Sequence, residues 1–147
     1  MKEVVLDTET TGISVKDGHR IVEIGCIELE NLSPTKNKFH CYLNPQKKVS
    51  EKAFEVHGYS DQFLSKQKIF SEVVDDFLDF IKNKRLIIHN AEFDIAHLNN
   101  ELNLLSKNKI QNEIIDTLTL AREKYPGSQV NLDALCKRYR IDNSRRT

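Results

Sequence analysis

The order of strand-like and helix-like segments constrains the fold of this chain more than any other feature of its sequence. Residues 2–7, 21–28 and 38–43 have the apolar residues of strands and are joined by polar turns. Such short connections favour antiparallel pairing. From residue 50 onward, helical periods alternate with short apolar runs. The sequence therefore predicts an α/β fold in which helices flank a mixed five-stranded sheet.

The later segments can be bounded individually. Residues 71–82 have the apolar stripe of a helix, with Ser71 as its predicted cap, and residues 86–88 form a strand before a helix that begins near Glu92. A short strand over 113–116 and a helix over 117–124 follow, and the helix stops before Pro126-Gly127. The last helix covers 131–139, behind Asn131 as its cap.

Composition indicates one domain and limits the binding partners. A length of 147 residues, without a repeat or a linker-like stretch, fits a single domain. The 22 basic and 22 acidic side chains cancel, which argues against coating long nucleic acid but permits a local site where metal ions supply the positive charge. No membrane span and no signal peptide are predicted, so we expect a cytoplasmic protein without a membrane partner. The three cysteines have no metal-ligand spacing, and we expect them to be reduced.

Two carboxylates stand one residue apart at the end of the first predicted strand. Residues i and i+2 of a strand project from one face, so Asp7 and Glu9 would point together and repel each other unless a cation lay between them. Their oxygen ligands favour a hard cation such as Mg²⁺ or Mn²⁺. Taken alone, the segment favours a turn capped by Asp7 and Thr8, with Glu9 in solvent, over a metal site.

Further acidic and imidazole side chains occur at the ends of later predicted elements. Asp94 falls in the first turn of its helix, where the helix dipole alone favours a carboxylate. Asp116 fits an N-cap before Thr117, and His57 fits a turn before Gly58. Together, however, carboxylates at the ends of several strands match a phosphodiester-cleaving site, in which two cations roughly 3.5 to 4 Å apart stabilise the attacking and leaving oxygens.

An ordered series of motifs resembles one protein family. The motifs are residues 7–12 (DTETTG), 19–25 (HRIVEIG), 53–58 (AFEVHG), 89–94 (HNAEFD) and 131–136 (NLDALC). In this order they resemble the epsilon proofreading subunits of bacterial DNA polymerase III, which are DEDD-type 3′-5′ exonucleases with a ribonuclease H-like fold. The resemblance implies a metal-dependent 3′-5′ exodeoxyribonuclease that removes mispaired 3′-terminal nucleotides during DNA replication.

The resemblance also implies residue roles. Asp7, Glu9 and Asp94 would be catalytic and would hold two divalent cations, Mg²⁺ or Mn²⁺, with Asp7 bridging both. Thr8, Thr10, Thr11 and His57 would lie near the terminal nucleotide of the substrate, with Asp7 and Glu9. Lys52 stands where the family often has a glutamate, five residues before the histidine, and is included among the substrate-binding candidates. Asp116, His89 and Asn90 would support the site.

The largest departure from the family lies at the end of the chain. In the family, the segment that matches residues 143–147 is followed by a His-Gly-Ala-x-x-Asp motif with the general-base histidine and a fourth metal-binding aspartate. The chain ends at Thr147. We therefore expect residues 1–147 to be a single exonuclease domain that lacks its C-terminal helix with the last catalytic motif, and to be catalytically impaired by itself.

Three functional hypotheses follow. The first is the proofreading exonuclease, whose partners would be the 3′ end of single-stranded or frayed DNA, the polymerase III alpha subunit and a small theta-like subunit. The second is an RNA-trimming 3′-5′ exoribonuclease of the same superfamily, which the carboxylates alone do not exclude. The third is a catalytically dead fragment that acts as a binding module.

Overall fold

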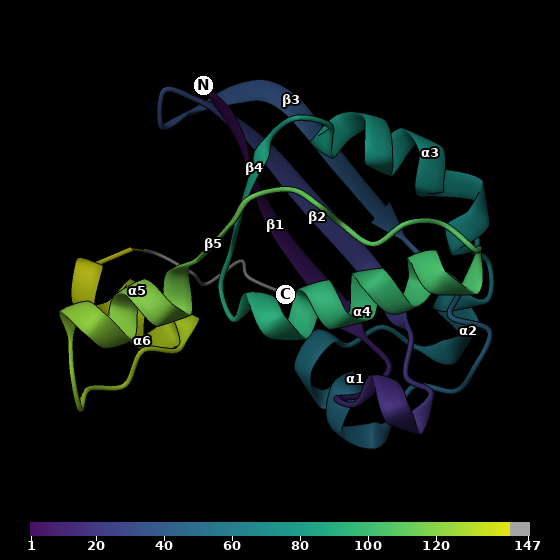
Figure 1. The fold of residues 1–147 in the computed structure, drawn as a ribbon. Coiled ribbons are helices and arrows are strands. Elements are labelled where there is room, and N and C mark those ends of the chain that lie inside the picture. Colours follow the sequence, from purple (N-terminus) through teal and green to yellow (C-terminus); the bar gives the residue numbers. More distant parts are fainter. Residues whose placement is uncertain (142–147) are drawn as a thin grey trace.

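A five-stranded mixed sheet forms the centre of the computed structural model, which describes residues 1–141 (Figure 1). Its strands are β1 (Lys2–Thr10), β2 (Ile21–Glu30), β3 (Ser33–Tyr42), β4 (Arg85–Ile88) and β5 (Ile114–Asp116), in the order β3-β2-β1-β4-β5. The first three strands pair antiparallel, whereas β4 and β5 lie parallel to β1. The predicted mixed α/β sheet and its antiparallel first half are confirmed.

The helices lie on one face of this sheet and at one of its edges. They are the short 3₁₀ helix η1 (Val15–Asp17) and the α-helices α1 (Glu51–His57), α2 (Asp61–Leu64), α3 (Phe70–Ile81), α4 (Ala91–Leu104), α5 (Thr117–Lys124) and α6 (Leu132–Tyr139). Both α3 and α4 pack on the same face, where Phe77 and Leu98 join Leu6 and Leu86 in one core. Burial of each such side chain contributes about 1.5–3 kcal/mol. No helix within residues 1–141 is long and apolar enough to cross a membrane.

Three predicted boundaries are wrong for identifiable reasons. The strand β1 continues to Thr10, so Asp7 and Glu9 lie inside it and pair with Gly25 and Glu23 of β2. The strand β3 begins at Ser33, because an edge strand tolerates Pro34, which cannot donate a ladder hydrogen bond.

The third correction concerns the start of α3. Ile69 is the N-cap residue, its amide donates to Glu72 Oε1 at 3.0 Å, and Ser71 lies within the first turn. The predicted Asn131 cap, in contrast, is confirmed, because its Oδ1 accepts from the amide of Ala134 at 2.7 Å. Residues 142–147, which include the family-like segment 143–147, lie outside the described part of the chain.

Candidate active site

The carboxylates predicted to bind metal come from β1 and from the first turn of α4. Alternation along β1 turns Leu6 and Thr8 toward the helix-covered face, so Asp7 and Glu9 project from the opposite face. Asp94 approaches from the covered side, is 3% exposed, and accepts a short hydrogen bond from the hydroxyl of Thr8. The structure thus brings Asp94 next to the strand that carries the other two carboxylates.

The electrostatics of Asp94 show that the three carboxylates share one neighbourhood. Burial raises the pKa of Asp94 to about 7, the bond from Thr8 opposes that rise, and the negative charges of Asp7 and Glu9 add to it. Within residues 1–141, no three His, Cys, Asp or Glu side chains already form a metal-binding cluster. Three oxygen donors whose mutual repulsion a cation would relieve nevertheless fit a hard divalent ion.

A bulge and a tightly held loop end β1 beside these carboxylates. The register with β2 shifts between Glu9 and Thr10, and such bulges are over-represented next to active sites. Thr10 donates from Oγ1 to the carbonyl of Gly12 at 2.6 Å. The ring of His19 packs so close to Gly12 that a Cβ there would lie 2.3 Å from it. A larger residue at position 12 would therefore displace the ring of His19.

His57 supports the same segment from α1. Its Nε2 donates to the carbonyl of Thr10 at 3.1 Å, and its Nδ1 accepts from the amide of Tyr59 at 3.0 Å. These bonds fix one neutral tautomer, and burial lowers the pKa of His57. The structure therefore places His57 beside the end of β1, with both ring nitrogens bonded within the protein. Its position near the terminal nucleotide of the substrate stays a prediction.

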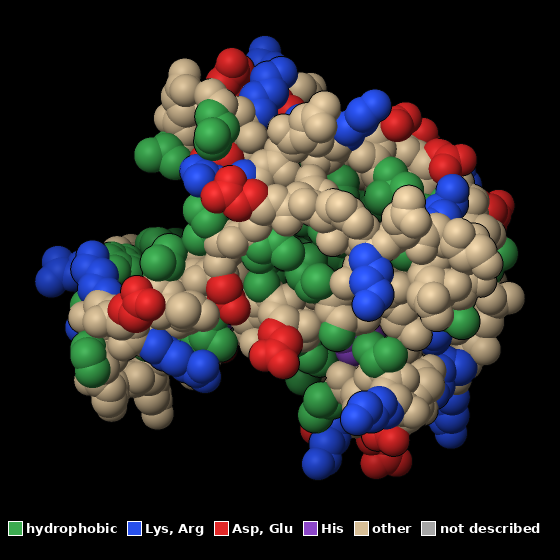
Figure 2. Space-filling model, in the orientation of Figure 1, with side chains coloured by type: hydrophobic (Ala, Val, Ile, Leu, Met, Phe, Trp, Pro, Cys, Tyr) green, Lys and Arg blue, Asp and Glu red, His purple; other side chains and the backbone are tan. Residues whose placement is uncertain are grey.

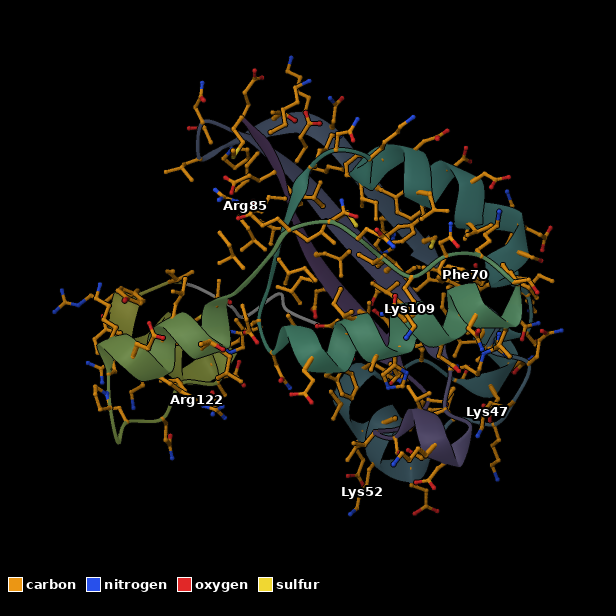
Figure 3. All side chains as sticks on the ribbon, in the orientation of Figure 1. Lys47, Lys52, Phe70, Arg85, Lys109 and Arg122 are labelled. Carbon is orange, nitrogen blue, oxygen red and sulfur yellow. The ribbon has the colours of Figure 1, made fainter. Side chains whose placement is uncertain are left out.

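The remaining sequence candidates lie at two different places. Lys52 is exposed on α1, and Figure 3 shows its side chain pointing away from the body of the molecule. Asp116 performs the predicted capping of α5 by accepting from the amide of Leu118 at 2.9 Å. Its carboxylate also accepts from the amides of Asn90 and Ala91, at 3.0 and 3.1 Å. Asp116 thus connects the beginnings of α4 and α5.

His89 and Asn90 occupy the turn between β4 and α4. His89 Nδ1 lies 3.0 Å from the hydroxyl of Thr117, and its Nε2 is buried without a hydrogen-bond partner in the described part of the chain. Asn90 has a positive φ of 64°, a conformation that asparagine tolerates better than most residues. This turn directs the chain from β4 into the helix that carries Asp94.

The sequence interpretation missed two residues on α4 that hold the loop after β1. His97 is 1% exposed and donates from Nε2 to the carbonyl of Ile13 at 3.0 Å. Glu101 is 2% exposed and accepts two bonds from Arg20, at 2.7 and 2.8 Å, and one from the amide of Ile21 at 3.2 Å. The spacing of these two polar residues, three and seven positions after Asp94, was the signal that could have identified them, because residues at this spacing lie on one helix face.

Comparison with known proteins identifies the family. The exonuclease family model, RNase_T, matches residues 4–146. The chain belongs to this exonuclease family. The family resemblance predicted from the motifs is confirmed at the level of sequence: the chain is 50% identical over 150 residues to DNA polymerase III subunit epsilon of Rickettsia felis, covering 99% of this chain and 66% of that protein.

Other members of the exonuclease family show the same extent of match. The epsilon subunit of Escherichia coli K12 is 45% identical over 154 residues, covering 99% of this chain and 63% of that protein. The chain therefore spans about two thirds of the length of these curated relatives. Family members of this fold generally use divalent metal ions.

Solved structures confirm the predicted ribonuclease H-like fold. A structure of exonuclease I superposes with a TM-score of 0.88 at 16% identity, covering 99% of this chain and 37% of that one. A structure of exonuclease X in complex with 5′ overhanging duplex DNA gives a TM-score of 0.74 at 22% identity, covering 95% of this chain and 74% of that one. At these identities the likeness establishes the fold.

Proposed function

We propose that this chain is the nuclease domain of a DNA polymerase III epsilon subunit and that it removes mispaired 3′-terminal nucleotides during replication in the bacterial cytoplasm. One observation carries this proposal: in a member of the exonuclease family, a buried carboxylate, Asp94, is hydrogen-bonded to Thr8, the residue between Asp7 and Glu9 on β1. Its partners would be the 3′ end of single-stranded or frayed DNA, the polymerase alpha subunit and a small theta-like subunit.

The carboxylates of Asp7, Glu9 and Asp94 would hold two divalent cations, Mg²⁺ or Mn²⁺. When bound, such ions lower the pKa of the attacking water and stabilise the charge on the leaving 3′-oxygen. Thr8 keeps the Asp94 carboxylate oriented through its hydroxyl. His57 fixes the carbonyl of Thr10, so that the segment from Thr8 to Thr11 has a defined shape for the terminal nucleotide.

Mispaired ends would be preferred because they fray more readily. Separating the terminal nucleotide from its pairing partner costs stacking and pairing energy, and this cost is smallest for a mismatch. The selectivity would therefore arise from the DNA end itself, since the proposed site handles only an unpaired 3′ nucleotide.

The family resemblance implies that catalysis needs more than residues 1–147. It assigns the general-base histidine and a fourth metal-binding aspartate to a motif after Thr147. We therefore expect residues 1–147 alone to cleave DNA several orders of magnitude more slowly than a protein that contains both groups. A fragment as fast as the protein from the complete reading frame would contradict this expectation.

A 3′-end cleavage assay on the protein from the complete reading frame tests the function. It should release nucleotides from the 3′ end of a single-stranded DNA in Mg²⁺ or Mn²⁺, and chelation by EDTA should stop the release. Asp7→Ala should abolish cleavage, whereas Asp17→Ala, an exposed aspartate on η1, should retain it. Full cleavage in EDTA, or by Asp7→Ala, would contradict the proposal.

An RNA-trimming activity is the alternative for the same site. Matched DNA and RNA strands under the same conditions distinguish the two, because the 2′-hydroxyl is the group that differs. We expect faster cleavage of DNA, given the extended similarity to subunits of a DNA polymerase. Substantially faster cleavage of RNA would replace the proofreading proposal.

A further inference from the structure

The helices α5 and α6 form an arm in which basic side chains outnumber acidic ones. We define the α5–α6 arm as residues 117–141, which stand beside the sheet in Figure 1. Figure 2, in the same orientation, shows Lys and Arg side chains on this part of the surface. The arm has five Lys or Arg residues and two acidic ones, whereas the whole chain has 22 of each. All five basic side chains are exposed: Arg122, Lys124, Lys137, Arg138 and Arg140. The arm thus has a local surplus of three basic side chains over acidic ones.

Cations from both helices of the arm gather around a pair of tyrosines. The hydroxyls of Tyr125 and Tyr139 form a short hydrogen bond. The guanidinium of Arg138 lies 4.0 Å from the ring centre of Tyr125, and Lys124 Nζ lies 5.6 and 5.7 Å from the two rings. Hydrogen bonding to Tyr139 raises the pKa of Lys124, so this amine stays charged. Two cations and two phenolic groups therefore meet at one point of the surface.

The helix dipole accounts for only part of this arrangement. Basic side chains near the C-terminus of a helix interact favourably with its dipole, and both helices have them in the last turn. The dipole does not explain why Lys124 of α5 and Arg138 of α6 converge on one aromatic pair. Phosphate oxygens are bound in proteins by this combination of Lys, Arg and hydroxyl donors, and aromatic rings beside them stack with bases.

The base of the arm is attached to the edge of the sheet where the candidate active site lies. Asp116 accepts from Asn90, Ala91 and Leu118 amides, so α5 begins next to the first turn of α4, which carries Asp94. His89 Nδ1 lies 3.0 Å from the hydroxyl of Thr117 and adds a second link at this point. The position of the arm relative to the carboxylates is therefore fixed at its base.

We propose that the α5–α6 arm binds the phosphodiester backbone of the single strand whose 3′ end lies in the active site. This inference rests on the proposed function, and it adds the place where the DNA strand beyond its 3′-terminal nucleotide is bound. The site itself is acidic, so it repels a polyanion beyond the nucleotide being removed. Because the chain has no net charge, its overall electric field does not offset this repulsion of the DNA. The basic arm supplies a local attraction for the phosphates.

Binding of a fluorescent single-stranded DNA of about 20 nucleotides, measured by anisotropy in EDTA, tests this inference. Lys124→Gln combined with Arg138→Gln should weaken binding roughly tenfold, with a salt dependence shallower by about 0.7 for each phosphate that the variant no longer neutralises. Lys109→Gln, which removes one exposed charge on the loop between α4 and β5, is the matched control and should bind like the parent. Unchanged thermal unfolding of the double variant verifies its fold.

The outcomes separate this inference from the proposed function. Equal binding and equal salt dependence for the parent and the folded double variant would overturn the role of the arm, whatever the cleavage assay gives. Loss of binding to a polymerase subunit, with DNA binding retained, would also overturn it in favour of a protein interface. Weakened DNA binding supports it even if the cleavage assay fails, because EDTA removes cleavage from the measurement.

Discussion

The helices α3 and α4 cover the same face of the sheet but are held there by different interactions. The buried side chains of α3 are all apolar: Phe70, Val73, Val74, Phe77 and Ile81. On α4, Asp94, His97 and Glu101 are nearly as deeply buried as its core leucines, and each bonds to β1 or to the segment that joins β1 to β2. Apolar burial is non-directional, whereas hydrogen bonds fix direction. We infer that α3 mainly stabilises the fold, whereas α4 mainly positions the end of β1 and the segment that follows it.

Among the variants that separate the roles of α3 and α4, Asp94→Asn should have the largest effect. The amide keeps an oxygen acceptor for Thr8 but removes the charge, so 3′-end cleavage should fall at least roughly 10³-fold. Because the folded pKa of Asp94 is raised to about 7 from an ordinary value of about 3.9, its ionisation lowers the stability of the fold as pH rises from about 4 to about 7, and this loss is complete above about 7. Urea unfolding at about pH 7 should therefore show stability equal to or above that of the parent. Lost stability with retained cleavage would reverse our assignment.

Phe77→Ala is the corresponding change on α3. This ring is fully buried, and its removal should lower the free energy of unfolding by about 3–5 kcal/mol. At a temperature where the variant remains folded, cleavage should stay within a few-fold of the parent. A loss of cleavage that exceeds the loss of folded protein would show that α3 also positions the site.

Glu101→Gln tests the positioning interaction farthest from Asp94 on α4. It removes one charge of a buried pair whose partner, Arg20, has a side chain 25% exposed, so we expect a loss of about 1–3 kcal/mol in stability. Because Arg20 borders the loop after β1, the KM for DNA should rise more than kcat falls. Asp75→Asn, in an exposed pair with Lys107, is the control and should change stability by less than about 0.5 kcal/mol.

The smallest effect should appear in the pH dependence of stability. Burial lowers the pKa of His97, with Glu101 and His19 as its charged neighbours, so the unfolded chain binds a proton more readily. The stability that neutral His97 contributes to the fold is fully present above the ordinary histidine pKa of about 6.5. It is lost as pH falls through the lower pKa that His97 has in the folded protein. Compared with the parent, His97→Gln should lose less stability between about pH 7 and pH 5. Parallel curves would contradict this assignment.

The sequence predicted local structure well where one short segment contains its own signals. The bounds of α5 and the Asn131 cap are confirmed because periodicity and capping residues are local. Asp116 shows the limit of such reasoning: its predicted cap is confirmed, but its bonds to Asn90 and Ala91 depend on how β4 and β5 pair.

The missed features depend on interactions between distant segments. His97 and Glu101 bind groups 84 and 80 residues away, at Ile13 and Ile21, and nothing near α4 in sequence announces those partners. The candidate carboxylates, in contrast, were chosen on the expectation that strand ends meet at one edge of the sheet. In the structure Asp7 and Glu9 lie inside β1 and Asp94 lies in α4, and metal binding by the three stays a prediction.

Binding of Mn²⁺, measured by the paramagnetic resonance signal of the free ion, tests whether the three carboxylates hold metal. The proposed ligands are Asp7, Glu9 and Asp94. Asp94→Asn should weaken Mn²⁺ binding by roughly tenfold or more, whereas Glu92→Gln, an exposed neighbour on the same helix, should leave it unchanged. Equal Mn²⁺ affinity in the parent and in folded Asp94→Asn would contradict the account.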